Sequence, residues 1–201
     1  MAKVIPAQPL REMAFRFSEL LVLSAPSFFE ALWGSLKFEV ARRCFFKKRN
    51  LFSYRHALFL GEEGEIKGMA LGYSFEEKRR ERLLTGFSII SYLLLYGERK
   101  RVSFLLRIFP LGEIKQGEFY LSNLAVYPEY QAQGLGKKLL GEVEKRVKEA
   151  GANCLVLDVD EENSVAISFY KRLGYFLESE LPPVELGDVL FRFLRMKKYL
   201  K

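Results

Sequence analysis

The segment YQAQGLGKKLLGEVEKRVKEAG, residues 130–151, places two glycines one residue apart directly before an amphipathic helical pattern. The apolar residues of this pattern recur at the three- and four-residue spacing of one helix face: Leu139, Leu140, Val143, Val147 and Ala150. EFYLSNLAV, residues 118–126, precedes the loop and predicts a strand. A strand, a glycine turn and a helix start predict a phosphate site, because the free N–H groups and the dipole of a helix N-terminus attract anions.

Two common phosphate loops do not match this segment. A loop for nucleotide hydrolysis needs Ser or Thr directly after Gly-Lys, whereas Gly136-Lys137 is followed by Lys138. A dinucleotide fingerprint needs a third small residue where this chain has Leu139, and it belongs to repeated strand–helix–strand units, of which only one is visible. The remaining pattern is Gln131, Gly134 and Gly136, in which the glycines let a pyrophosphate approach the backbone closely.

A second motif, NSVAISFYKRLGY at 163–175, follows about 30 residues after the loop. Together, LAVYPEYQAQGLGKKLL and LDVDEENSVAISFYKRLGY resemble the GNAT superfamily of acetyl-CoA-dependent N-acetyltransferases. The resemblance covers roughly residues 118–176 and implies an acyltransferase that uses acetyl-CoA as cosubstrate, without a metal. An alternative is a catalytically weak member of the same fold that binds CoA, a protein or nucleic acid.

The order of elements along the chain predicts an α/β or α+β fold, with helices packed on a mixed sheet. Helical runs at about 8–24 and 28–48 follow a short strand before Pro6, and a hairpin occupies 55–75. After the loop and its helix, an apolar strand at 154–159, a helix at 163–175 and two C-terminal strands complete the chain. The resemblance implies a GNAT-like, mostly antiparallel twisted sheet with helices on both faces, in a single domain over 1–201.

The resemblance also implies the roles of individual residues. The pantetheine arm of CoA would bond to the backbone of the strand at 124–126 and to the Asn163 side chain, and the pyrophosphate would lie on the amides of 133–137. Tyr170 would stand near the thioester sulfur as the general acid for the leaving thiolate. The implied cofactor-binding set is Leu124, Ala125, Val126, Gln131, Gln133, Gly134, Leu135, Gly136, Lys137, Asn163 and Tyr170.

The general base does not follow from the motifs. Tyr120 and Ser122 stand where some relatives have Glu or His, and neither is a good base at neutral pH. Glu118 shares the side-chain parity of Tyr120 but lies further back, and His56 is the only histidine. We therefore expect a remote carboxylate acting through water, or no dedicated base.

Composition restricts the other possibilities. One His and two Cys exclude the usual zinc spacings and a disulfide framework, so a reducing cytoplasm is the simplest expectation. Cys154 lies in an apolar run and is expected in the core, whereas Cys44 lies among basic residues that could lower its pKa. The net charge of +7 comes from scattered basic clusters, which we interpret as solvated surface without a clear nucleic-acid or membrane partner.

Residues 76–115 lie outside the resemblance and predict two helices before Pro110. One hypothesis is that they roof the acceptor side of the thioester site, which favours a small or apolar-bodied amine as the acceptor. Equally open are a packing extension and a homodimer surface, and a third interpretation is a basic amphipathic element on a membrane. The apolar residues of the first of these helices are Leu83, Leu84, Phe87, Ile89, Ile90, Leu94 and Leu95.

Overall fold

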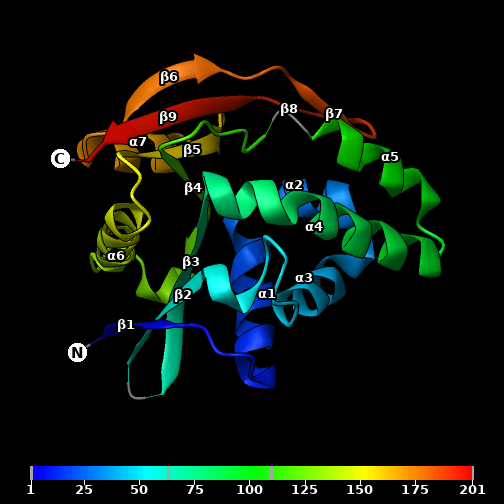
Figure 1. Ribbon diagram of the computed structural model, residues 1–201, viewed down its shortest axis with the longest axis horizontal. Coiled ribbons are helices and arrows are strands. Elements are labelled where there is room, and N and C mark those ends of the chain that lie inside the picture. The colour runs from blue at the N-terminus through cyan, green and yellow to red at the C-terminus, as the bar shows by residue number, and fades with distance from the viewer. Residues whose placement is uncertain (1, 63, 109–110, 201) are drawn as a thin grey trace.

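The computed structural model describes residues 2–62, 64–108 and 111–200, so Pro110 lies outside the described part. A seven-stranded mixed sheet has the order β1-β2-β3-β4-β5-β9-β6, and all its pairs are antiparallel except β4 with β5 (Figure 1). Its strands are β1 (Lys3–Pro6), β2 (Ala57–Glu62), β3 (Glu65–Ser74), β4 (Glu118–Val126), β5 (Cys154–Asp160), β6 (Phe176–Glu180) and β9 (Phe193–Tyr199). The predicted fold class, strands and hairpin are confirmed.

Helices cover both faces of the sheet, as predicted. One face carries α6 and α7, and the other carries α1 to α5 (Figure 1). The helices are α1 (Arg11–Ser24), α2 (Pro26–Trp33), α3 (Lys37–Phe45), α4 (Phe75–Leu95), α5 (Arg99–Arg107), α6 (Leu135–Glu149) and α7 (Ser164–Arg172). Each face therefore has its own apolar core, and the sheet separates the two.

Two expected elements are interrupted. The helical run at 28–48 divides into α2 and α3 at Gly34, whose φ of 57° is one that glycine adopts readily. A Cβ at Gly34 would also lie 2.4 Å from the guanidinium of Arg101, so the break lets α5 approach α2. The last strand is broken at Arg192, before which β7 (Val184–Leu186) and β8 (Val189–Phe191) form a separate two-stranded ribbon.

The central strand β4 pairs with β5 over only part of its length. The parallel ladder joins Glu118–Tyr120 to Cys154–Val156 and then stops. On its other side, β4 pairs with β3 throughout but has one extra residue at Ser122, because Leu71 faces Asn123 and Gly72 faces Leu121. Such a bulge bends and twists its strand. The second half of β4 therefore diverges from β5 and opens a gap in the middle of the sheet.

Buried ion pairs hold the closed end of this gap. Lys197 of β9 reaches across β5 and donates to Glu118 of β4 at 2.7 Å, with both side chains less than a tenth exposed. Lys197 also bonds to Glu178 at 3.0 Å. The hydroxyl of Tyr120 donates to Asp158 at 3.1 Å, just beyond the last backbone pair. Side chains thus continue the connection between β4 and β5 where the backbone ladder ends.

The segment after β3 folds into α4 and α5, as predicted, and packs on the rest of the protein. Lys78 of α4 donates to the carbonyl of Gly112 at 2.6 Å, and Arg101 of α5 donates to the carbonyl of Glu30 at the end of α2 at 3.1 Å. No helix in residues 2–62, 64–108 and 111–200 is long and apolar enough to cross a membrane.

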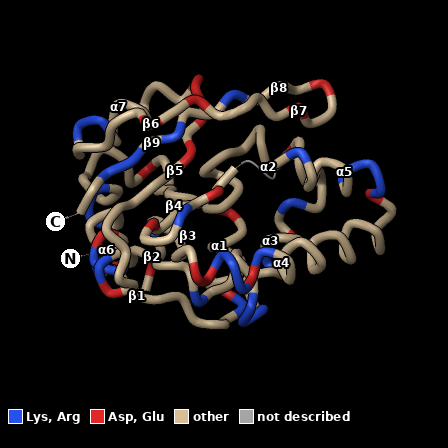
Figure 2. The backbone as a smooth tube through the Cα atoms, turned by 45° about the horizontal axis from the view of Figure 1, so that its top comes forward, with Lys and Arg blue, Asp and Glu red and all other residues tan. Residues whose placement is uncertain are grey.

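Only some of the apolar side chains of α4 are buried in the core. The buried side of α4 includes Ile89 and Leu93 but also Glu81 and Thr85. Glu81 is bonded to His56, and Thr85 accepts from the amide of Leu51. Figure 2 shows no charged residue on the second half of the helix, yet much of that half is exposed. The exposed apolar side chains are Leu83, Leu84, Phe87, Leu94 and Leu95. A homodimer surface on this face stays a prediction.

We predict that Lys197→Met lowers the free energy of unfolding by about 3 kcal/mol, because it leaves the Glu118 carboxylate buried without its cation. The neighbouring Lys198→Met removes a more exposed ion pair with Glu144 and is expected to cost less than about 1 kcal/mol. Urea unfolding of both variants measures the difference. Equal losses in the two variants would contradict the proposed importance of the buried pair.

Candidate functional site

The loop between β4 and α6 is held in one shape by its own bonds. The Gln131 side chain donates to the carbonyl of Val126 at 2.9 Å and ties the loop to the end of the strand. Ala132 and Gly134 have φ angles of 59° and 76°, which turn the chain into the helix. Gly134 begins α6 without a side-chain cap, so the amides of the first helical turn remain available to an anion.

A cleft of about 680 Å³ opens at this loop and runs along the diverging half of β4. All residues of the implied cofactor-binding set line it except Gln133, which is exposed and donates to the carbonyl of Glu129 at 3.4 Å. Among the described residues that line the cleft, the charged ones are Lys137 and Arg172. The donor-rich loop and basic charge fit an anionic, phosphate-bearing carrier such as CoA.

The two glycines of the loop differ in what requires them. Gly134 needs its positive φ, whatever space surrounds it. Gly136 is helical, and a Cβ there would lie 3.5 Å from the ring of Phe169, an ordinary contact. The fold itself therefore tolerates a methyl group at Gly136. Close approach of a ligand to the backbone is the remaining reason for a glycine at this position.

Asn163 and Tyr170 come to the cleft from α7. The Oδ1 atom of Asn163 accepts from the amide of Ala166 at 3.0 Å and caps the helix, which leaves its amide nitrogen as a donor for a ligand. Tyr170 lies on the inner face of α7 and is 8% exposed, with its ring 5.5 Å from that of Tyr175. Burial raises the pKa of Tyr170, so its hydroxyl keeps its proton at physiological pH.

A second cavity, of about 450 Å³, lies on the far side of Tyr170, between the C-terminal end of β5 and the start of α2. The described charged residues that line it are Asp158, Asp160 and Glu162, so it is acidic although the chain has a net charge of +7. The two cavities share the walls Ser24, Leu124, Asn163, Ala166 and Tyr170. The two cavities therefore adjoin, one basic and one acidic, with Tyr170 in their common wall, and we refer to the pair as the passage.

The strand residues considered as bases do not serve as such in this geometry. Burial and the nearby Asp158 carboxylate raise the pKa of Tyr120, whose hydroxyl donates to that carboxylate. Ser122 lines the acidic cavity, but its hydroxyl donates to Asn123 at 2.8 Å. Glu118 faces away from the passage and is bonded to Lys197 and to the amide of Lys115. The base is therefore not on β4.

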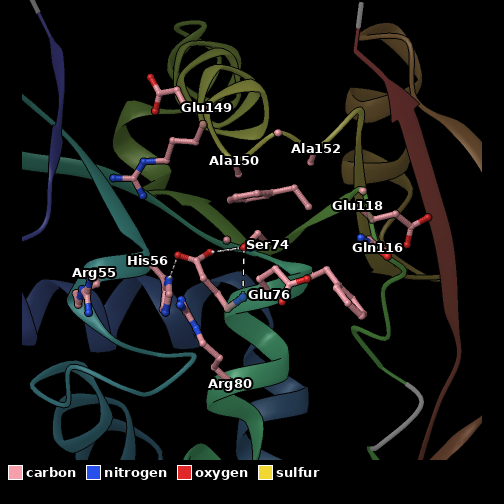
Figure 3. Close-up of a pocket in the computed structure, with 17 residues that line it drawn as sticks. Arg55, His56, Ser74, Glu76, Arg80, Gln116, Glu118, Glu149, Ala150 and Ala152 are labelled. Carbon is pink, nitrogen blue, oxygen red and sulfur yellow. Dashed lines mark hydrogen bonds and ion pairs between the residues drawn. The ribbon is translucent and has the colours of Figure 1, made fainter.

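His56 is structural. It lies in a different cavity of about 560 Å³, between the end of α6 at Glu149 and Ala150 and the start of α4 at Ser74 (Figure 3). Its Nε2 atom is 2.8 Å from the carboxylate of Glu81, and both side chains are buried. The pair connects the start of β2 to α4, and neither residue lines the passage at Tyr170.

The cysteines also belong to the core. Burial raises the pKa of Cys44 to about 11, and this effect exceeds that of the neighbouring basic residues that could have lowered it. Cys154 is buried at the closed end of the β4–β5 ladder, and burial raises its pKa as well. Neither thiol is poised as a nucleophile, since the thiolate is the reactive form.

Sequence reasoning missed several residues that the fold brings to the passage. Leu23 and Ser24, from the end of α1, line the cofactor side, and no local pattern marked them. Asp158 accepts hydrogen bonds from Arg195, from Tyr120 and from the amide of Gly112. It thus joins β5 to β9, to β4 and to the segment between α5 and β4. Its only signal was its place among the acidic residues Asp158, Asp160, Glu161 and Glu162 at the end of an apolar run.

Comparison with known proteins agrees with this geometry. A 67-residue segment of this chain is 37% identical to the ribosomal protein bS18 alanine N-acetyltransferase of Escherichia coli. The matched segment makes up 33% of this chain and 45% of that protein. The match thus spans less than half of that relative. An N-acetyltransferase structure from Staphylococcus aureus Mu50 has a similar fold, with a TM-score of 0.68 at 18% identity over 96% of this chain and 99% of that one.

A third similar protein is the Bacillus subtilis acetyltransferase solved in complex with CoA, with a TM-score of 0.58 at 11% identity over 100% of both chains. These structural likenesses concern the fold. The family model of the acetyltransferase (GNAT) family matches residues 21–175, which include the loop at Gly134, the strand β4 and the helix of Tyr170. The chain therefore belongs to the GNAT acetyltransferase family.

Proposed function

We propose that this protein is an N-acetyltransferase that moves the acetyl group of acetyl-CoA directly onto a primary amine of a small molecule. The observation that carries the proposal is the pair of adjoining cavities that share the wall at Tyr170 and are lined by charges of opposite sign. Lys137 and Arg172 suit the phosphates of CoA, and Asp158, Asp160 and Glu162 suit an ammonium group. Tyr170 stands where the two substrates would meet.

When bound, acetyl-CoA supplies the thioester carbonyl that the amine attacks. The first-turn amides of α6 would hold the pyrophosphate, and the backbone of β4 beyond Tyr120 would bond to the pantetheine arm, because β5 no longer pairs with it. Asn163 adds a side-chain donor on the opposite wall. These groups orient the thioester toward the junction of the two cavities.

Tyr170 acts on the leaving sulfur. Its raised pKa keeps the hydroxyl protonated, so it donates a hydrogen bond to the sulfur and stabilises the thiolate as the C–S bond breaks. The proton that Tyr170 passes to the thiolate is returned to it from water, which in turn receives the proton that the amine loses. The amine must lose a proton before or during attack, since free alkylamines are mostly protonated at neutral pH. Asp160 and Glu162 are the carboxylates that could accept it through water, because Asp158 is already engaged by Arg195.

A small-molecule acceptor fits the position of the acidic cavity. The cavity shares walls with a smaller space that is lined in part by residues of α4 and α5. The bS18 relative acetylates a protein alanine, by its name, but the match covers only about a third of this chain. We therefore place the acceptor among small amines.

The Gly136→Ala variant is expected to weaken acetyl-CoA binding about tenfold, which corresponds to ~1.4 kcal/mol, because the methyl group would occupy the path of the pyrophosphate. Its melting temperature should stay the same or rise slightly, since Ala is a better helix former than Gly. Gly141→Ala in the same helix is the control, because Gly141 lines none of the cavities described above. Calorimetric titration with CoA measures both variants, and equal affinities would contradict the proposed pyrophosphate position.

The Tyr170→Phe variant should lower kcat by ~10²-fold or more, with the Kd of acetyl-CoA unchanged, because it removes only the proton donor to the sulfur. Tyr199→Phe, on the exposed end of β9, is the control and should keep full activity. CoA release with an amine panel provides the measurement. Normal turnover of Tyr170→Phe would remove the acid role, whereas tight acetyl-CoA binding without release by any amine in the native protein would favour a CoA-binding, non-catalytic function.

The Asp160→Asn and Glu162→Gln variants should each raise the KM for the amine about two- to fivefold at low salt, and less at high salt, because partly exposed carboxylates attract the ammonium through a screened field. The KM for acetyl-CoA should not change. Glu161→Gln, between them in the sequence, removes an exposed charge that lines neither cavity of the passage and should leave the amine KM unchanged. Identical amine KM values in all three variants would contradict the acidic entrance.

A further inference from the structure

A third space, of about 180 Å³, adjoins the acidic cavity. The two share walls at Phe28, Asp158 and Phe193, so a molecule that extends past these side chains would reach from one into the other. Asp158 is the one charged residue among the described residues lining this third space, and the rest of the lining is largely apolar. We refer to this space as the inner cavity.

Aromatic rings form much of the wall of the inner cavity. They include Phe28 and Phe193, whose ring centroids are 5.7 Å apart at an interplanar angle of 90°. Trp33 and Phe52 form a second edge-to-face pair, with centroids 5.4 Å apart. Rings in such an arrangement favour a further ring among them, because each offers a face or an edge to it.

The insertion closes the inner cavity from the side opposite the sheet. Ile89 of α4, Leu105 of α5 and Ile108 after it line the cavity. Helix α5 packs against both α2 and α4 (Figure 1), and Arg101 fixes it to the carbonyl of Glu30. The α4–α5 segment thus limits how large a group can enter, as the roof hypothesis required.

Trp33 presents an unpaired polar group next to this space. The residue is fully buried and lines the inner cavity, yet its indole Nε1–H has no hydrogen-bond acceptor among the described residues. Buried N–H groups without a partner are rare, because desolvation without a compensating bond is costly.

We propose that the acceptor substrate is a primary amine carrying one aromatic ring, with its ammonium in the acidic cavity and its ring in the inner cavity. This rests on the proposed acetyltransferase function and specifies its acceptor class. The volume agrees with one ring, since apolar cavities of about 150 Å³ in proteins bind benzene.

The first test compares CoA release with ethylamine, 2-phenylethylamine and 2,2-diphenylethylamine. The single ring should raise kcat/KM over ethylamine on the order of 30-fold, from the apolar area that it buries, and the second ring should abolish the gain because it exceeds the cavity. Leu105→Trp should reduce the ratio for the single ring to near unity by filling the cavity. Leu106→Trp, whose side chain is 78% exposed, should keep the native ratio.

The second test needs no catalysis. Trp33 is the only tryptophan of the chain, so its fluorescence reports directly on the inner cavity. Titration of the native protein with 2-phenylethylamine, without acetyl-CoA, should change the tryptophan emission in a saturable way, and ethylamine should not. In the double variant Trp33→Phe/Leu105→Trp, the new indole fills the cavity, so low concentrations of 2-phenylethylamine should no longer change the emission.

These results separate the two proposals. Saturable ring binding without CoA release from any amine would overturn the acetyltransferase function but keep the ring site. Turnover of ethylamine and 2-phenylethylamine at equal kcat/KM, with no fluorescence change, would overturn the ring site and keep the acetyltransferase. Efficient use of 2,2-diphenylethylamine would also overturn it, because two rings cannot occupy this cavity.

Discussion

The candidate site depends on the separation of β4 from β5 after Tyr120. A central strand normally has both sets of backbone groups paired, and an unpaired buried strand edge is costly. Here the extra residue at Ser122 bends β4 away, and the freed edge becomes a surface to which a ligand backbone can bond. The buried Glu118–Lys197 pair keeps the other end closed, so the gap widens in one direction only.

Asp158 lies just beyond the end of the β4–β5 backbone ladder and connects several elements there. Its oxygens accept from Arg195 of β9 and from the Tyr120 hydroxyl, and also from the amide of Gly112. A buried carboxylate needs such partners to remain charged. The same contacts pull the end of the insertion against the sheet, so one residue connects the shape of the gap with the walls of the inner cavity.

The charges that line the passage differ from the net charge of the chain. The chain has a net charge of +7, yet the acceptor end is lined by carboxylates, and the cofactor end has Lys137 and Arg172. A narrow cavity with apolar walls focuses the field of the few charges that line it, so the local set decides which ligand each end attracts. The basic clusters elsewhere on the surface do not enter the passage.

The cofactor side could be predicted from the sequence because its parts are contiguous. The strand, loop and helix start lie within residues 118–137, and glycine spacing and periodicity express physical rules that act over a few residues. The α4 pattern shows where this reasoning ends. An apolar stripe predicts a buried face, but in the first half of α4 Glu81 and Thr85 are buried by their bonds to His56 and Leu51, and the second half buries Ile89 and Leu93 while leaving other apolar residues exposed.

The acceptor side was decided by packing between segments that are distant in the sequence. Trp33 and Leu105, Ser24 and Asp158, and Glu118 and Lys197 meet only because α1, α2, the insertion and β9 assemble around the same strand. No local spacing encodes such meetings, since each depends on which elements share a face and in what register. Residue order was therefore enough to indicate a CoA-type phosphate loop, whereas the chemistry of the acceptor became visible only in the folded chain.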